Sequence, residues 1–450
     1  MKSDFLEYIQ KEFWFDDREM QDFETYLIAP LKKSIRVNTN KISVKDFQTL
    51  ALSNGWVLTP TWYGKNTFYI DRSEDLKIAL WNTFEHLSGY FYVQEVAAST
   101  SPYYLCDDRI DETPYLILDM SAAPGGKSTQ LSEYYPNSII IANEIDKTRL
   151  RALEENIDRM GATNILVTNY DGRHFKNTPE MFDKILLDAP CSGEGTSFKT
   201  EEALRFWNMK NIETISRLQI QLLESALVAL KVWGEMVYST CTLNTIENEQ
   251  VVEKMLEKYS ESLEIVEFDT TSKYHRNWPH RDKTWGFFVA KIRKVASMNS
   301  EYTPQKRPLQ NFEKLQNKQE KYIEDFLKKY FWYAERIHLL KYKESIFLTG
   351  RSVSFLWEHL FFFKVWIEIG TLRWGNFEPS FFLGTLRSFE KWILAKSIDE
   401  CEKLLSGYEI EDISKDWYYQ ILSPKGVPIW MARLKWKRLK SLIPSKLTRK

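Results

Sequence analysis

The sequence predicts an α/β fold in which a doubly wound, mostly parallel sheet lies between two layers of helices. From Tyr115 onward, short apolar runs alternate with helical stretches, which is the pattern of right-handed strand–helix–strand units. The length of 450 residues exceeds what one hydrophobic core accommodates, so other domains must flank this sheet. We expect a small α/β domain before it and a mixed α+β region after it.

Five apolar runs of strand length predict the central sheet. They are Tyr115–Asp119, Ser138–Ala142, Asn164–Thr168, Lys184–Asp188 and Glu235–Ser239. Each is continuously apolar inside, so each strand is expected to be buried on both faces. Two later runs, Leu263–Phe268 and Trp285–Arg293, are expected to close one edge.

The helices between these strands carry end signals. A helix over Lys147–Met160 should end at Gly161, and one over Asn211–Val232 should end before Gly234. Another helix should open at Ser128. A last one should start at Asn244, which forms a capping pair with Glu247.

Changes in composition divide the chain into four parts. The predicted boundaries are 1–108 for an N-terminal domain, 109–295 for the sheet domain, 296–325 for a linker and 326–450 for a C-terminal region. The linker is rich in Ser, Asn, Gln, Lys and Pro. The last 26 residues, from Lys425, carry nine Lys or Arg and no acid, which suits contacts with phosphates.

Bulk composition excludes several classes of protein. A hydrophobic fraction of 43% with 27% charged residues is typical of a soluble globular chain. The four cysteines, Cys106, Cys191, Cys241 and Cys401, form no CxxC pair, so we expect neither a disulfide framework nor a metal site. The N-terminus lacks a secretory signal, and the apolar run Phe355–Ile369 is interrupted by charges, so that run should form buried strands or a helix. We expect a cytoplasmic protein that does not enter a membrane.

The loop after the first strand has the residues of a ligand site. Asp119 is followed by Met-Ser-Ala-Ala-Pro-Gly-Gly-Lys, and a helix opens at Ser128. Gly125 and Gly126 would let the backbone approach a ligand, and the helix N-terminus favours an anionic group. The spacing is not that of a dinucleotide-binding loop. A tight turn without a ligand is the competing interpretation.

Acidic residues follow the next strands at the same edge of the sheet. Glu144 after the second strand is placed to hydrogen-bond ribose hydroxyls, with Asp146 as the competing choice. Asp171 follows the third strand, where it could meet an adenine amino group, and Asp188 ends the fourth. Any one could be a surface acid, but acids at successive strand ends favour a nucleoside-containing ligand.

Two cysteines follow neighbouring strands, Cys191 after the fourth and Cys241 after the fifth, so both should face one pocket. We expect a helix N-terminus at each turn to lower the pKa of the thiol. A buried structural role for both, or a disulfide between them, is the alternative. A thiolate beside a methyl donor suits methylation of cytosine at carbon 5, because addition of sulfur at carbon 6 makes carbon 5 nucleophilic. The base must be unstacked, and Asp188 could hydrogen-bond its edge.

These motifs resemble those of the Nol/Nop/Sun family of RNA cytosine-C5 methyltransferases. The likeness rests on Ser121–Lys127 (SAAPGGK), Asp188–Gly195 (DAPCSGEG) and Thr240–Thr242 (TCT), supported by Arg36–Asn38, Gly89–Glu95 and Gly286–Ala290. It covers about Ile35 to Lys294. The resemblance implies a Rossmann-like methyltransferase core that uses S-adenosyl-L-methionine.

The resemblance also implies a role for each motif. The cysteine of the TCT motif, here Cys241, is the nucleophile, and the cysteine of the PCSG motif, here Cys191, promotes product release. Asp188 completes the predicted catalytic set. The residues implied to bind the cofactor are Ser121, Ala122, Ala123, Pro124, Gly125, Gly126, Lys127, Glu144, Asp171 and Asp188.

The C-terminal region resembles the PUA-like RNA-binding extension of the F-type subfamily of bacterial 16S ribosomal RNA cytosine-C5 methyltransferases. The landmarks are Glu368–Gly370, Phe377–Pro379, Pro428–Trp430 and Leu439–Lys440. This implies RNA-binding roles for residues 1–108 and 326–450, with 16S ribosomal RNA or the small ribosomal subunit as partner. We expect a monomer, with Trp430 and Trp436 in the core of a small β domain and base stacking as their alternative role.

Other functions stay open at this point. A catalytically inactive RNA-binding or ribosome-assembly factor would be expected to carry a damaged motif, whereas both cysteines, the glycines and the acids are intact. A methyltransferase for a protein or small molecule would leave the two thiols and the basic C-terminal segment unexplained. Transfer RNA is the alternative RNA substrate.

Overall fold

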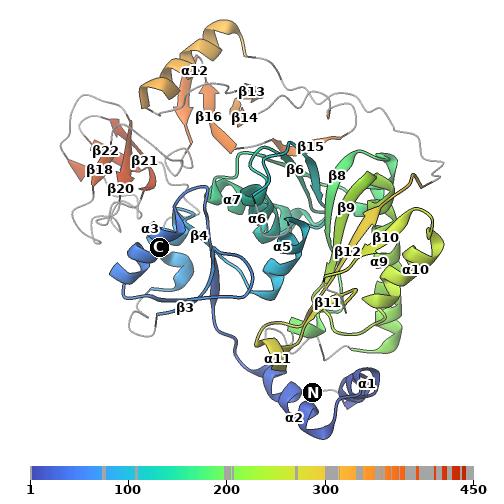
Figure 1. Ribbon diagram of the computed structural model, residues 1–450. Helices are drawn as coiled ribbons and strands as arrows, with labels where there is room; N and C mark the ends of the chain where they lie inside the picture. Colours follow the sequence, from blue (N-terminus) through green and yellow to red (C-terminus); the bar gives the residue numbers. More distant parts are fainter. Residues whose placement is uncertain are drawn as a thin grey trace.

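The computed structural model describes residues 3–72, 78–106, 110–196, 204, 207–268, 272–298, 313, 315–330, 338–349, 356, 360–365, 367–373 and 375–380. It also describes strand backbone at 392–394, 410–411, 418–422, 428–435 and 438–441. The strands of this described part form four sheets (Figure 1). Cys401 and Trp436, the Trp430 side chain and most of the basic C-terminal segment lie outside the described residues.

The largest sheet confirms the predicted doubly wound α/β fold. Its strands are β5 (Leu116–Asp119), β6 (Ile139–Asn143), β7 (Ile165–Thr168), β8 (Phe182–Asp188), β9 (Leu230–Thr240), β10 (Leu263–Val266), β11 (His275–Asn277), β12 (Phe287–Lys294) and β15 (Phe362–Val365). The order is β10-β12-β9-β8-β5-β6-β7-β15, with β11 beside β12. The strands from β9 to β7 are parallel, and the strands outside them run antiparallel to their neighbours.

Helices cover both faces of this sheet because alternate side chains of each strand point to opposite faces. The covering elements are α5 (Thr100–Cys106), α6 (Gly126–Tyr134) and α7 (Lys147–Met160) on one face, and η3 (Gly172–Asn177), α9 (Met209–Ala229) and α10 (Glu249–Lys258) on the other. On β5, for example, Ile117 packs with Leu131 and Leu153, while Leu118 belongs to the core that contains Leu223. Figure 1 shows the two layers. The sheet core is therefore apolar throughout, and polar chemistry is confined to its edges.

Two helix boundaries differ from the prediction. The helix expected to reach Val232 ends at Ala229, because Leu230 already pairs with Phe182 as the first residue of β9. The helix predicted to start at Asn244 begins only at Glu249, as α10. The predicted capping pair does form, because Asn244 Oδ1 accepts a hydrogen bond from the Glu247 amide at 2.8 Å. Strand pairing and a local side-chain network therefore override the helical pattern at these two points.

The N-terminal part contains two units. The elements are α1 (Ser3–Phe13), α2 (Asp17–Ile28), β1 (Ser34–Val37), α3 (Val44–Ser53), β2 (Val57–Pro60), β3 (Thr67–Asp71), η1 (Leu80–Asn82), α4 (Phe84–Leu87), β4 (Phe91–Val93) and η2 (Ala97–Ser99). The four strands form an antiparallel sheet ordered β2-β3-β1-β4 with its own core. Helices α1 and α2 instead pack against Trp207, Leu243 and Trp278 of the central domain. The boundary at residue 108 remains a prediction.

The described C-terminal elements are mainly strands. They are α12 (Asn317–Tyr330), β13 (His338–Tyr342), β14 (Ser345–Thr349), β16 (Ile367–Arg373), β17 (Asn376–Pro379), β18 (Trp392–Leu394), β19 (Ile410–Glu411), β20 (Tyr418–Leu422), β21 (Pro428–Lys435) and β22 (Arg438–Ser441). The described part of the apolar run Phe355–Ile369 supplies β15 and the start of β16, so strands replace the helical alternative. Among the described helices, none is long and apolar enough to cross a membrane.

A buried ion pair joins the N-terminal sheet to the central domain. Arg36 on β1 is fully buried and pairs with Glu133 on α6. Its guanidinium also donates hydrogen bonds to Gln94 Oε1 at 2.9 Å, Thr129 Oγ1 at 2.8 Å and the carbonyl of Gly126 at 3.2 Å. The sheet is thereby fixed against the start of α6.

We expect Arg36→Met to lower the free energy of unfolding by about 3–5 kcal/mol, because it leaves the buried Glu133 carboxylate unpaired. Urea unfolding measures the loss. The control is Arg217→Met, which breaks an exposed pair with Glu213 and should change stability by less than about 1 kcal/mol. The double variant Arg36→Met/Glu133→Leu should lose less than the sum of the single variants; strict additivity would contradict the coupling.

Candidate active site

A buried carboxylate at the end of β5 fixes the loop between β5 and α6. Asp119 at the end of β5 accepts a hydrogen bond from Ser128 Oγ at 2.6 Å, and burial raises the pKa of Asp119 to about 7. Gly125 has φ +107°, a conformation that favours glycine. A Cβ at Gly126 would lie 3.1 Å from the Tyr92 ring, so this glycine allows β4 to pack closely against the loop.

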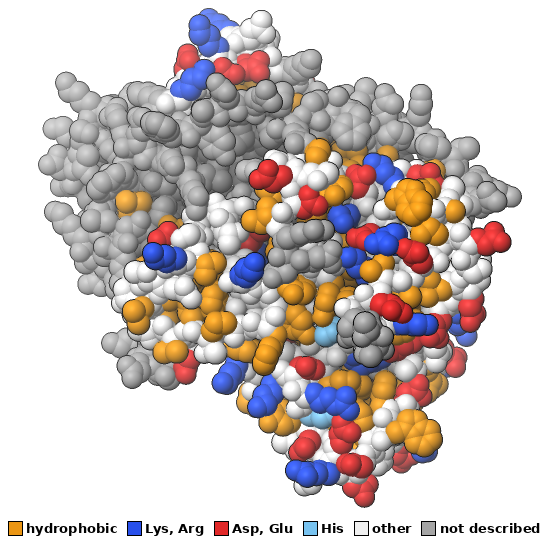
Figure 2. Space-filling model, viewed as in Figure 1, with side chains coloured by type: hydrophobic (Ala, Val, Ile, Leu, Met, Phe, Trp, Pro, Cys, Tyr) orange, Lys and Arg blue, Asp and Glu red, His pale blue; other side chains and the backbone are white. Residues whose placement is uncertain are grey.

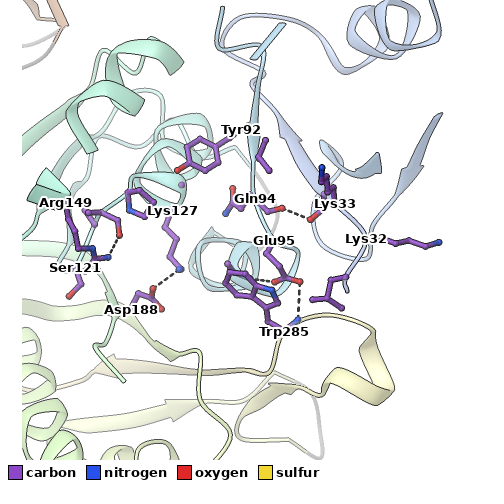
Figure 3. Close-up of a pocket in the computed structure, with 18 residues that line it drawn as sticks. Lys32, Lys33, Tyr92, Gln94, Glu95, Ser121, Lys127, Arg149, Asp188 and Trp285 are labelled. Atoms are coloured by element: carbon purple, nitrogen blue, oxygen red, sulfur yellow. Dashed lines mark hydrogen bonds and ion pairs between the residues drawn. The ribbon is translucent and has the colours of Figure 1, made fainter. Parts of the chain in front are cut away.

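A cavity of about 570 Å³ lies between this loop and the N-terminal sheet (Figure 3). Its described lining residues are Leu31, Lys32, Lys33, Ser34, Tyr92, Val93, Gln94, Glu95, Ala98, Ser121, Ala122, Ala123, Pro124, Gly126, Lys127, Arg149, Asp188 and Trp285. Seven of these are among the residues that the sequence predicts for the site. The remaining predicted residues, Gly125, Glu144, Asp171, Cys191 and Cys241, do not line it.

The acids after β6 and β7 differ in the hydrogen bonds and ion pairs that their carboxylates make within the protein. Glu144 is buried; its Oε1 accepts a hydrogen bond from the Asp146 amide, while its Oε2 accepts none from the described residues and lies 3.5 Å from the Arg149 guanidinium. Asp146 is exposed and caps the N-terminus of α7. Asp171 caps η3 and pairs with Arg173 at 2.5 Å. Of these three acids, Glu144 is thus the one with a buried oxygen that accepts no hydrogen bond from the described residues.

Lys127 and Asp188 form an ion pair at the floor of the cavity (Figure 3). Lys127 Nζ lies 2.7 Å from Asp188 Oδ2, and Ser239 Oγ donates to Asp188 Oδ1 at 3.0 Å. Burial lowers the pKa of Lys127, but the charge of Asp188 and the hydrogen bond to it outweigh burial, so the pKa is raised. Lys127 therefore stays an ammonium group.

The two cysteines meet as predicted from neighbouring parallel strands. Cys191 Sγ and Cys241 Sγ lie 3.2 Å apart, and both are free thiols. The hydrogen bond with Cys241, burial and the charge of Cys241 hold the pKa of Cys191 well above its ordinary value. The expected lowering by a helix N-terminus is wrong for Cys191, because its pKa is raised; the described residues directly after it form only the short turn η4 (Glu194–Thr196). Cys191 is therefore expected to keep its proton.

A buried carboxylate that the sequence reasoning did not assign holds the two cysteine loops together. Glu194 Oε2 accepts hydrogen bonds from Thr242 Oγ1 at 2.7 Å and from the amides of Leu243 at 2.9 Å and Asn244 at 3.0 Å. Its Oε1 accepts from Asn244 Nδ2 and from Trp207 Nε1 at 2.6 Å. The residue is fully buried. The position of an acid inside the motif D-A-P-C-S-G-E-G could have indicated this role from the sequence.

A second buried carboxylate supports the same loops. Glu247 accepts hydrogen bonds from the Ser192 amide, Gln219 Nε2 and Asn244 Nδ2, and burial raises its pKa. The amide of Gly195 also donates to the carbonyl of Cys241 at 3.0 Å. The Cys241 loop and the Cys191 loop are thus one hydrogen-bonded unit.

The strand order, the loop after β5 and the two thiols at the carboxyl edge define a Rossmann-like methyltransferase. Residues 107–293 match the family described as 16S rRNA methyltransferase RsmB/F, and residues 1–96 match the N-terminal domain of 16S rRNA methyltransferase RsmF. The chain belongs to this family, which confirms the resemblance seen in the motifs.

Individual relatives agree with this membership. Ribosomal RNA small subunit methyltransferase F of Erwinia tasmaniensis is 43% identical over 295 residues, which are 63% of this chain and 61% of that protein. The Vibrio vulnificus protein of the same name is 40% identical over 322 residues, 68% of this chain and 67% of its own length. The chain therefore spans about three fifths to two thirds of these relatives.

Solved structures show the same fold. A methyltransferase homolog protein from Pyrococcus horikoshii has a TM-score of 0.55 at 30% identity, covering 65% of this chain and 100% of that one. NSun6 from the same organism, solved with SFG, has a TM-score of 0.58 at 26% identity and covers 66% of this chain and 99% of that one.

Proposed function

We propose that this chain transfers a methyl group from S-adenosyl-L-methionine to carbon 5 of a cytosine in 16S ribosomal RNA. The observation that carries the proposal is the contact between Cys191 and Cys241, beside the ion pair of Lys127 with Asp188. Two thiols at one edge suit a covalent adduct and its release, which methylation of oxygen or nitrogen does not require. The names of the relatives support ribosomal RNA as the substrate.

The chain's own residues take distinct roles in this reaction. Cys241 Sγ releases its proton to solvent and forms a bond to carbon 6 of the cytosine, and the carbon 5–carbon 6 electron pair forms the bond between carbon 5 and the methyl group, so that the cofactor would leave as the demethylated thioether. Loss of the carbon 5 proton to a base then lets the sulfur–carbon 6 bond break. Asp188 accepts a hydrogen bond from the cytosine edge, and the Lys127 ammonium stabilises negative charge that develops on the ring. Cys191, which keeps its proton, promotes release.

The residues around the β5 loop fit a nucleoside-containing cofactor, which supplies the methyl group. Glu144 Oε2, which lies 3.5 Å from the Arg149 guanidinium but accepts no hydrogen bond from the described residues, suits a ribose hydroxyl, because a buried acceptor without a hydrogen bond is costly. The loop Ser121–Lys127 and Asp188 are proposed to hold the methionine end. Asp171 is proposed to contact adenine, although Arg173 already occupies its carboxylate. The relative solved with SFG, an analogue of S-adenosylmethionine, supports this assignment.

The flanking regions are proposed to bind RNA. This applies to residues 1–108 and 326–450, with 109–295 as the catalytic domain and 296–325 as the linker. We further propose that the protein acts as a cytoplasmic monomer on 16S ribosomal RNA or the small subunit.

A trapping experiment with Cys191→Ala tests the proposal. Incubated with S-adenosylmethionine and total RNA, this variant should accumulate the Cys241 adduct, which appears as a slow RNA-containing band on a denaturing gel. The band should vanish in Cys191→Ala/Cys241→Ala, and the wild type is the control for turnover. Sequencing the attached RNA identifies the substrate; transfer RNA there would correct the RNA class. No adduct in the variant and no methyl transfer by the wild type to total RNA or small subunits would refute the function.

A further inference from the structure

One face of the N-terminal sheet carries a second cavity beyond the site described above. Val57 and Thr59 on β2 pair directly with Asp71 and Tyr69 on β3, and Tyr69 pairs with Ser34 on β1, so these side chains share a face. The alternate residues, such as Leu58 and Ile70, belong to the sheet's own core. The shared face therefore points away from that core, and a cavity of about 540 Å³ lies along it, with the core residues Ile70 and Leu80 also in its lining.

The same face leads directly to the candidate active site. Arg36 pairs with Tyr92 across β1 and β4, and these two residues dock on the loop at Gly126. Lys32 and Lys33, just before β1, line both cavities. The part of this face on β1 and β4 thus covers the β5 loop, and the part on β2 and β3 borders the second cavity, which we call the groove. Figure 3 places Lys32 and Lys33 at the side of the first cavity away from Asp188.

The chemistry of the groove favours a polyanion with aromatic parts. Its described lining residues are Lys32, Lys33, Val57, Thr59, Tyr69, Ile70, Asp71, Arg72, Ile78, Ala79 and Leu80. Three bases against one acid give this lining a positive balance, although the whole chain has a net charge of −1. On the face of the central domain that Figure 2 shows, acidic and basic side chains are interspersed. Half-buried Tyr69 adds an aromatic ring, and an open sheet face with aromatic side chains is a common platform for single-stranded RNA.

We propose that this groove binds the single-stranded RNA that flanks the target cytosine, with phosphates on Lys32 and Lys33 and a base against Tyr69. The inference rests on the proposed function and deepens it, because it assigns a path for the strand that enters the active site. A cytosine must leave its stack to reach the two thiols, and holding the adjoining nucleotides would keep it unstacked.

Equilibrium binding tests the lysine contacts without any need for turnover. Fluorescence anisotropy is measured with a labelled single-stranded RNA of about 16 nucleotides, the upper site size of comparable single-strand binders. In Lys32→Ala/Lys33→Ala, the slope of log binding constant against log salt concentration should be less steep by about 1.4, since each phosphate contact contributes about 0.7. Lys45→Ala, an exposed lysine on α3 outside both cavities, is the control and should bind like the wild type.

Tyr69 separates the groove from the active-site cavity, because it lines only the groove. Tyr69→Leu should weaken binding at least about fivefold, whereas Tyr69→Phe, which keeps the ring, should not. Thr59→Glu, at an exposed position on the same face, adds a negative charge and should also weaken binding. This variant tests the groove even if Tyr69→Leu does not fold.

The outcomes are distinct. If Lys32→Ala/Lys33→Ala weakens binding but Tyr69→Leu and Thr59→Glu do not, the RNA is confined to the first cavity and the groove proposal is wrong. The proposal is also wrong if Lys32→Ala/Lys33→Ala binds RNA like Lys45→Ala. A wild type that binds through the groove but methylates no RNA would refute the proposed function alone.

Discussion

Cys241→Ala is expected to abolish methyl transfer and to leave the affinity for S-adenosyl-L-methionine within about twofold of the wild type. Without the sulfur bond at carbon 6, carbon 5 of cytosine has no nucleophilic character, so no other group on the protein can substitute. Cofactor binding should persist because Cys241 does not line the cavity beside the β5 loop. Transfer of a labelled methyl group to RNA measures the first quantity, and calorimetric titration with the cofactor measures the second.

A matched cysteine makes this experiment specific. Cys106→Ala removes a buried thiol on α5 that donates a hydrogen bond to the Tyr103 carbonyl, and it should keep methyl transfer close to the wild-type rate. Retained transfer in Cys241→Ala would show that the covalent route is wrong. Loss of transfer together with loss of cofactor affinity would show instead that Cys241 supports the fold of the site.

The sequence sufficed for the parts of the structure that depend on continuous apolar runs. β5, β6 and β7 lie within one residue of the runs that predict them, because a strand buried on both faces has few polar residues to obscure its limits. β8 and β9 begin two and five residues earlier than predicted, where charged residues interrupt the apolar pattern. The meeting of Cys191 and Cys241 was also predictable, since each ends one of two adjacent parallel strands. Their roles as release group and nucleophile remain predictions.

Other features depend on contacts between distant segments and were not predictable. Tyr92, Glu95 and Trp285 line the cavity only because the N-terminal sheet docks on the β5 loop, which no local pattern reveals. The late start of α10 has a similar cause. Asn244 is held by Glu194, fifty positions earlier in the chain, and this contact competes with the helical conformation that its capping pattern favours.

Glu194→Gln is expected to lower the turnover number by about 100-fold, as a displacement of roughly 1 Å at a reacting group does. Both carboxylate oxygens of Glu194 accept hydrogen bonds, so an amide in its place removes one acceptor and, in either orientation, directs N–H groups at donors: those of Thr242 and Leu243 at Oε2, or that of Trp207 at Oε1. The loop that carries Cys241 should then relax away from Cys191. The hydrogen bonds that Glu194 accepts come from Trp207, Thr242, Leu243 and Asn244, so we expect it to position the loop that carries Cys241.

The trapping reaction separates this positioning role from a general loss of stability. In Glu194→Gln/Cys191→Ala, the RNA adduct should form about 100 times more slowly than in Cys191→Ala, while cofactor affinity is unchanged because the β5 loop is not disturbed. Glu224→Gln is the matched control: Glu224 on α9 accepts hydrogen bonds from Lys258 and Tyr259, outside the site, and its loss should not alter trapping. A double variant that is less stable but forms the adduct at the normal rate would show that Glu194 serves the fold alone. Slow formation of the adduct by a stably folded variant that binds the cofactor would instead show that the buried carboxylate positions Cys241. In that case, only the step that uses the Cys241 sulfur has changed.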